Sequence, residues 1–161
     1  MTTIAELTVG TAELKTSGSP YPGATSDGST ARAFLSFSKG DVAYWSFYVP
    51  QNCGSSLSVD IFFMMETATS GNILLDVAVE AITTGDSTDL DNTSSFATTN
   101  ALSATAVPGT AGYAKRVTIP LSNNDSFAEA DMVRLALTRT NSAGDTASGE
   151  LRFLIGAVNA V

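Results

Sequence analysis

The chain has 161 residues, and 16 acidic against 8 basic side chains give it a formal net charge of −8 at pH 7. A chain of this length is most simply one domain, which can bury about 70% of its unfolded surface. A nucleic-acid partner requires a basic surface that neutralises phosphates, so the acidic excess argues against one.

The first 30 residues predict a segment peripheral to the core. Residues 2–15 carry scattered apolar side chains, which fit either one bent strand or an extended arm. Residues 16–30 are rich in Gly, Ser and Pro, a composition typical of loops. We therefore assign residues 1–30 to an N-terminal arm and loop segment and residues 31–161 to a β-sandwich domain. The N-terminus lacks a basic start and an apolar stretch, so we expect no signal peptide.

From Ala31 onward, apolar and polar residues alternate with the period of two that is typical of strands. Lys39-Gly40-Asp41 is a tight-turn signal between the first two runs. Trp45 shares a face with other apolar residues, which favours a core position over a platform for sugar stacking. The predicted strands cover about residues 31–38, 42–49, 57–65, 73–82, 117–121, 133–138 and 151–155, with a weaker run at 96–107.

One stretch fits two structures. Ser126 to Glu129 matches a helix capping box, and good helix formers follow it. A short helix is therefore an alternative. We expect a single helical turn at residues 126–130 followed by a strand, because the apolar period after Asp131 is two.

Eight or nine strands with regularly spaced turns predict an all-β fold. We expect a two-sheet antiparallel jelly-roll-like β-sandwich of about eight strands with an extended N-terminal arm. An immunoglobulin-like sandwich is the alternative, although the cysteine pair of antibody domains is absent.

The residues that carry most enzyme chemistry are missing. The chain has no His, which excludes Ser-His-Asp and Cys-His machinery, and Cys53 is its only thiol. Asp76 and Glu80 share a strand face but lie about 13 Å apart, beyond the separations that glycosidases use. The sequence does not test whether two carboxylates from different strands or loops lie close enough to form such a pair. We therefore expect a non-enzyme with no catalytic residue, cofactor or metal.

The acidic loop at residues 85–91 has two possible interpretations. Its carboxylates could hold calcium, which prefers several oxygen ligands. The alternative is a solvated loop with Asx turns, and the loop does not have the EF-hand spacing.

The strands are partly apolar on both faces, whereas a sheet face in water is usually polar. Tyr44, Tyr48, Phe62 and Met64 lie on the sides opposite Trp45 and Ile61. Either the N-terminal arm or a long loop covers these four residues, or they form an interface between subunits.

Residues 43–89 and 107–158 resemble a β-sandwich domain of tailed-bacteriophage structural proteins. The shared pattern is an aromatic strand ending in Val49-Pro50, a long apolar strand, a Ser-Gly-Asn turn, an acidic loop and a D-ϕ-V-R-ϕ-x-ϕ-x-R run from Asp131 to Arg139, where ϕ is apolar. The likeness is one of pattern, without a catalytic signature.

The resemblance implies a virion component that is most similar to capsid decoration (cement) proteins. It implies binding to the major capsid protein on the outer capsid surface, self-association as a homotrimer, and assembly in the host cytoplasm. We expect no nucleic-acid partner because the chain is acidic, and no membrane partner because its longest apolar runs, at residues 61–65 and 153–158, are too short to cross a bilayer. Two alternatives stay open: a phage fibre, neck or tail appendage subunit, and a carbohydrate-binding adhesion module.

Overall fold

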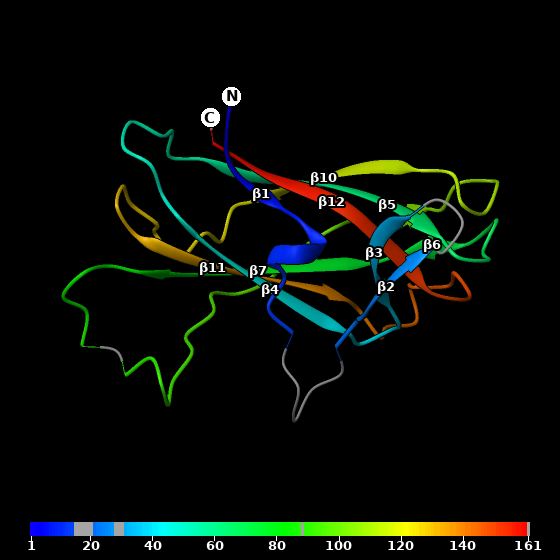
Figure 1. Cartoon of the computed structure of the whole chain (residues 1–161). Helices are drawn as coiled ribbons and strands as arrows, with labels where there is room; N and C mark the ends of the chain where they lie inside the picture. The colour runs from blue at the N-terminus through cyan, green and yellow to red at the C-terminus, as the bar shows by residue number, and fades with distance from the viewer. Residues whose placement is uncertain (15–20, 28–30, 88, 161) are drawn as a thin grey trace.

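The computed structural model describes residues 1–14, 21–27, 31–87 and 89–160, which form two antiparallel sheets packed face to face (Figure 1). In this part of the chain twelve strands occur, eight of them with six or more residues. The predicted all-β, jelly-roll-like sandwich of about eight strands is therefore confirmed. None of the described residues forms a helix with the length and apolarity needed to span a membrane.

The larger sheet has β12, the C-terminal strand, near its centre. β12 pairs with β5 along one edge, and with both β3 and the N-terminal β1 (Thr2–Leu7) along the other. The two chain ends therefore lie side by side at the upper left of Figure 1. The strand order is β10 (Lys115–Leu121), β5 (Leu57–Met65), β12 (Leu151–Ala160), β3 (Arg32–Phe37) and β2 (Gly23–Asp27).

The smaller sheet forms the lower layer of Figure 1 and has β11 at its centre. Its strand order is β4 (Val42–Tyr48), β11 (Met132–Arg139), β7 (Leu75–Ile82) and β8 (Asn100–Ala101). The weak run expected at 96–107 forms only two short strands, β8 and β9 (Thr105–Ala106), and β9 pairs with β6 (Asn72–Ile73). A Thr/Ser/Ala-rich segment offers little apolar surface to bury, so most of it remains a loop.

The core fills the space between the sheets with the apolar residues expected to face inward. Trp45 is buried there, with its ring centre 5.2 Å from that of Phe153. Its indole Nε1 donates a hydrogen bond of 2.9 Å to the backbone oxygen of Thr8. The prediction of a core tryptophan is confirmed, and its polar atom is satisfied by the N-terminal segment.

The first 30 residues differ from the expectation of a peripheral arm. Leu7 at the end of β1 is buried in the core, and a short 3-10 helix, Val9–Thr11, follows. β2 pairs with β3 over five residues. The sequence signal was weak because β1 pairs with the irregular edge of β12 and buries only its last side chain fully. The parts of the expected loop at 15–20 and 28–30 lie outside the described residues.

The helical turn expected at residues 126–130 is wrong. Ser126 and Ala130 have φ values of 53° and 67°, in the left-handed region, so no right-handed turn forms. The carboxylate of Asp131 instead accepts a hydrogen bond of 2.7 Å from the Ala128 N–H and closes a tight loop. The strand predicted after Asp131 is confirmed as β11.

A buried ion pair fastens one end of the sandwich. Arg139 is fully buried at the end of β11, and its guanidinium binds both carboxylate oxygens of Asp145, at 3.0 and 2.9 Å. It also donates to three backbone oxygens, those of Phe37, Ala147 and Gly149. One side chain thus joins β3, β11 and the loop before β12.

We expect Asp145→Asn to lower the free energy of unfolding by about 3–5 kcal/mol at pH 7, because it leaves a buried guanidinium without its counter-charge. Burial alone would raise the pKa of Asp145, but hydrogen bonds and charge attraction from Arg139 outweigh it and hold the pKa below its usual 3.8. The contribution of Asp145 to stability is therefore present above pH 3.8 and lost as pH falls through its lower folded-state pKa. Urea unfolding at several pH values should show the variant and wild type converging in acid.

Arg116→Gln is the matched control. Arg116 also pairs with an aspartate, Asp60, at 3.2 Å, but its side chain is 55% exposed. An exposed pair contributes only about 0–1 kcal/mol. Equal losses in the two variants would contradict the role assigned to the Arg139–Asp145 pair.

Candidate functional site

A groove of about 310 Å³ lies on the outer face of the four-stranded sheet. Tyr44 of β4 and Arg134 of β11 project into it from the sheet. Its walls come from the N-terminal segment on one side and the loop between β7 and β8 on the other. The lining residues are Glu13, Leu14, Tyr44, Ser94, Phe96 and Arg134.

Two small residues make room for the aromatic side chains. Ala136 is paired with Tyr44 on one neighbour and with Ala78 on the other, so the sheet surface beside Tyr44 is flat. Phe96 reaches this surface from beyond β7, and the ring centres of Phe96 and Tyr44 are 5.9 Å apart. Both alanines are buried although they face outward. The aromatic pair therefore belongs to the groove and not to the core between the sheets.

The groove carries a fixed guanidinium. Arg134 lies with its central carbon 5.4 Å from the ring centre of Phe96 and 5.9 Å from that of Tyr44, within the range of cation–π attraction. Its Nη1 donates to Glu80 Oε2 at 2.7 Å, and Glu80 is buried. The positive charge is thus compensated, while donor atoms remain at the groove surface, where Arg134 is 28% exposed.

Backbone pairing holds both walls in place. On the open edge of β4, Glu13 exchanges two hydrogen bonds with Tyr44, at 2.7 and 3.1 Å. On the far side, the Ser95 N–H donates to the buried Glu80 carboxylate, and the Ala97 N–H donates to the Val79 oxygen at 2.8 Å. The groove is therefore preformed by the fold.

The same face continues beyond Arg134 as an exposed apolar surface. Tyr48 pairs in register with Met132, and their exposed fractions are 60% and 38%. Tyr48 is four residues from Tyr44 on the same strand and the same side, which places the two about 13 Å apart. This distance suits an extended ligand lying along β4. At the opposite end of this face, burial raises the pKa of Asp76 above its usual 3.8.

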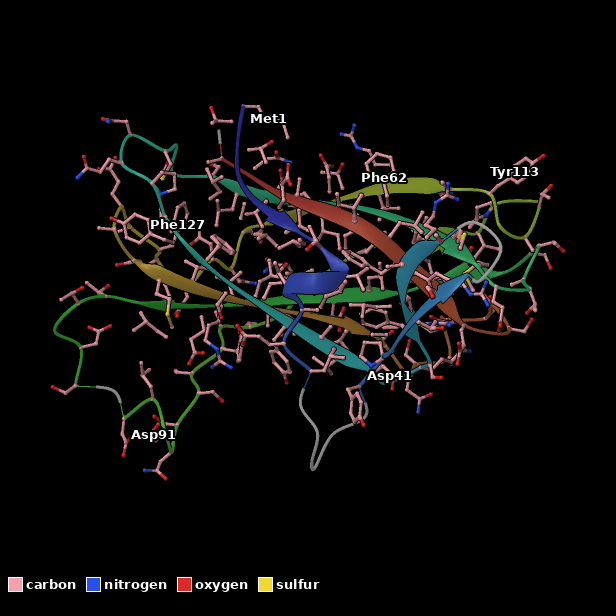
Figure 2. The ribbon with its side chains drawn as sticks, in the orientation of Figure 1. Met1, Asp41, Phe62, Asp91, Tyr113 and Phe127 are labelled. Atoms are coloured by element: carbon pink, nitrogen blue, oxygen red, sulfur yellow. The ribbon has the colours of Figure 1, made fainter. Side chains whose placement is uncertain are left out.

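The four residues predicted as an interface lie on two different sheets. Tyr44 and Tyr48 share the face just described, and Glu13 and Phe96 partly cover Tyr44, as the arm-or-loop alternative expected. Phe62 and Met64 lie on the outer side of the six-stranded sheet, where Figure 2 shows Phe62 at the top of the sandwich. The interface itself stays a prediction.

Sequence reasoning missed Phe96, Glu80 and Ala136 as parts of this site. Phe96 is the only aromatic residue between positions 64 and 112 and lies in a polar loop. An isolated aromatic residue of this kind could have indicated a side chain that packs on the sheet or binds a ligand. The Glu80–Arg134 pairing required knowledge that β7 and β11 are neighbours, which no local pattern supplies.

Polar groups in the acidic loop form hydrogen bonds with one another. Asp89 accepts hydrogen bonds from the Asp91 N–H at 3.1 Å and from the Asn92 side chain at 2.7 Å, as in an Asx turn. These bonds lower the pKa of Asp89. Among the described residues no three His, Cys, Asp or Glu side chains converge as metal ligands. Figure 2 shows Asp91 at the far end of this loop.

No protein-family model matches this sequence, and no curated protein matches it significantly. Solved structures do share its fold. A family 35 carbohydrate-binding module from Clostridium thermocellum aligns with a TM-score of 0.61 at 11% identity, over 98% of this chain and 100% of that one. A family 36 carbohydrate-binding module, solved with calcium and xylotriose, aligns with a TM-score of 0.50 at 15% identity over 97% and 100%.

A family 115 4-O-methyl-α-glucuronidase with specificity for decorated arabinogalactans aligns over all of this chain but only 18% of its own length, with a TM-score of 0.53 and 11% identity. Identities this low establish the fold alone. They place this chain in the jelly-roll architecture that the two binding modules share.

We expect Glu80→Gln to loosen the wall that carries Phe96, because Glu80 accepts both the Arg134 and the Ser95 bonds and an amide has one acceptor oxygen. Hydrogen exchange at the Ser95 and Ala97 amides should accelerate, with a loss of stability of about 1–3 kcal/mol. Asp86→Asn, which alters an exposed bond to the Thr83 N–H in the same loop, is the control. Equal exchange changes in the two variants would contradict a specific role for Glu80.

Proposed function

We propose that the protein is a glycan-binding module that uses the groove on the four-stranded sheet. The observation that carries this proposal is the pairing of partly exposed ring surface with fixed polar groups. Tyr44 and Phe96 are half-buried and line the groove with apolar ring surface against which a sugar ring can pack, and Arg134, which lies against both rings, places donors beside them. Sites for small ligands commonly combine mostly apolar walls with a few oriented polar groups.

The shape of the site supports an extended neutral saccharide. Tyr48 lies beyond the groove on the same outward face of β4, about 13 Å from Tyr44, so an extended ligand can contact both rings. Glu80 already neutralises Arg134, which removes the attraction that an acidic sugar would need. The shared architecture with carbohydrate-binding modules agrees with this assignment, although fold likeness alone does not fix a ligand.

The proposal is for binding without catalysis. Glu13 is the one carboxylate among the lining residues of this groove. Glu80 lies beneath them, buried and already bonded to Arg134 and Ser95. Glycoside hydrolysis ordinarily requires two available carboxylates on either side of the scissile bond.

A glycan array that includes plant, bacterial and animal polysaccharides should show binding to a neutral, unbranched glycan. We expect Tyr44→Leu to weaken that binding about fivefold, because it removes a stacking ring of roughly 1 kcal/mol while keeping apolar cover over Ala136. Tyr48→Ala should give a similar loss on longer oligosaccharides only. Isothermal titration measures both effects.

Phe62→Leu, on the other sheet, is the matched control and should leave glycan affinity unchanged. An array without any glycan bound at high protein concentration would end the proposal. So would a Tyr44→Leu variant that folds normally and binds as tightly as the wild type.

A second candidate function is capsid decoration, which the sequence resemblance implies and which one observation favours. Phe62 of β5 and Ile155 of β12 are register partners on the outer side of the six-stranded sheet, with exposed fractions of 40% and 43%. Exposed apolar pairs of this kind often mark contacts between proteins. Their partner would be the major capsid protein or a second copy of this chain.

For this candidate we expect Phe62→Glu to abolish binding to undecorated capsids, because it buries a charge in an apolar contact, and to reduce any self-association seen by light scattering. Tyr113→Glu, exposed in the loop before β10, serves as the control. Capsids that bind neither wild type nor variant at micromolar concentration would argue against decoration.

A further inference from the structure

A larger groove, of about 780 Å³, lies on the six-stranded sheet and takes no part in the function proposed above. It is formed by β2, β3, the end of β5 and the start of β12. It shares no lining residue with the groove on the four-stranded sheet. Its volume is within the usual range for small-molecule sites.

The floor of this groove is formed by the guanidinium of Arg152, which is stacked on the ring of Phe34. Phe34 points to the outer side of β3, away from the core, yet it is buried because the Arg152 guanidinium lies 4.5 Å above its ring centre. Arg152 Nη2 donates a hydrogen bond of 2.8 Å to Glu66, which fixes the orientation of the guanidinium plane. The Nε of Arg152 is buried and has no acceptor among the described residues, whereas about a quarter of the side chain is exposed and lines the groove.

The walls are rich in oxygen atoms at fixed positions. Glu150 accepts hydrogen bonds from the hydroxyl groups of Ser36 and Ser38, and Asp41 accepts one of 2.7 Å from the Ser38 N–H. Tyr21, 45% exposed, contributes a ring to the lining. Carboxylates accept and a guanidinium donates, which matches hydroxyl groups that do both.

The charge of the groove excludes acidic ligands. Three carboxylates, those of Asp41, Glu66 and Glu150, stand against one guanidinium. Burial raises the pKa of Asp41, and the neighbouring negative charge of Glu150 raises it further. An anionic sugar would meet the same repulsion.

We propose that this groove is a second saccharide site, which binds an uncharged sugar through hydrogen bonds to Glu150 and Arg152 and ring contact with Tyr21. The inference extends the proposed function, and its outcome is separable because the two grooves lie on different sheets. The ligand class follows from the combination of paired acceptors, a stacked donor and an exposed ring.

The test is a titration of the full-length ¹⁵N-labelled protein with xylohexaose, cellohexaose and isomaltohexaose in turn, and with hexagalacturonate as a charged comparison. At least one neutral hexasaccharide should shift the amides of β2 and of residues 150–152. Tyr21→Ala and Glu150→Gln should each weaken that response about tenfold and leave shifts in β4 and β11 unchanged. Tyr44→Leu should do the reverse.

The proposal is overturned if none of the three neutral sugars shifts β2 and residues 150–152, or if hexagalacturonate binds there as tightly. Shifts confined to β4 and β11 would leave the first groove as the only saccharide site. Shifts confined to β2 and residues 150–152 would support the second site while removing the first. Circular dichroism of each variant checks that loss of binding is not loss of fold.

Discussion

The buried contact between Arg139 and Asp145 is the constraint on which this end of the molecule depends. A guanidinium taken out of water must have its donors satisfied, and here they are met by one carboxylate and three backbone oxygens from separate segments. Asp145 in turn accepts from the Leu74 N–H and pairs with Lys39. Loops that carry little apolar surface of their own are thereby fixed in position. The β3–β4 turn, which supplies Ser38 and Asp41 to the larger groove, is one of them.

The outer faces follow from a second constraint, the pairing of strands. Each outward side chain must fit beside its register partners, and the small Ala78 and Ala136 leave a flat surface on which side chains from other segments can pack. Phe96 and Tyr44 meet there, and Arg134 lies against both. A strand that is apolar on both sides therefore has two separate explanations in this protein: core packing on one side, and an aromatic groove on the other.

Local pattern predicted most of the fold, because period-two alternation identifies strands and their inward faces. β5 has the bounds expected of it, and Trp45 lies in the core. The failures occur where local signals and tertiary pairing disagree. β1 lacks alternation but pairs with the edge of β12. The apparent capping box at Ser126 does not form a helix, because the backbone of Ala130 and Asp131 is hydrogen-bonded to Val49 instead. The sequence of the run from Asp131 to Arg139 shows a pattern of charged and apolar positions but not what each position does. The structure gives its members distinct roles: loop closure by Asp131, groove lining by Arg134 and core anchoring by Arg139.

The proposed role as an adhesion module fits a rigid sandwich that has two polar-aromatic grooves and an exposed apolar pair, Phe62 and Ile155, on its six-stranded sheet. Single sugar sites are weak, because each contact replaces hydrogen bonds to water and gains little. Two sites on one chain, or many chains on one particle, convert weak contacts into firm attachment through effective concentration. The Phe62–Ile155 pair lies on β5 and β12, whereas the first groove lies on the other sheet, so anchoring through the pair leaves that groove open. The two proposed functions, glycan binding and decoration of a larger assembly, are thus compatible on one scaffold, and their residues can be tested independently.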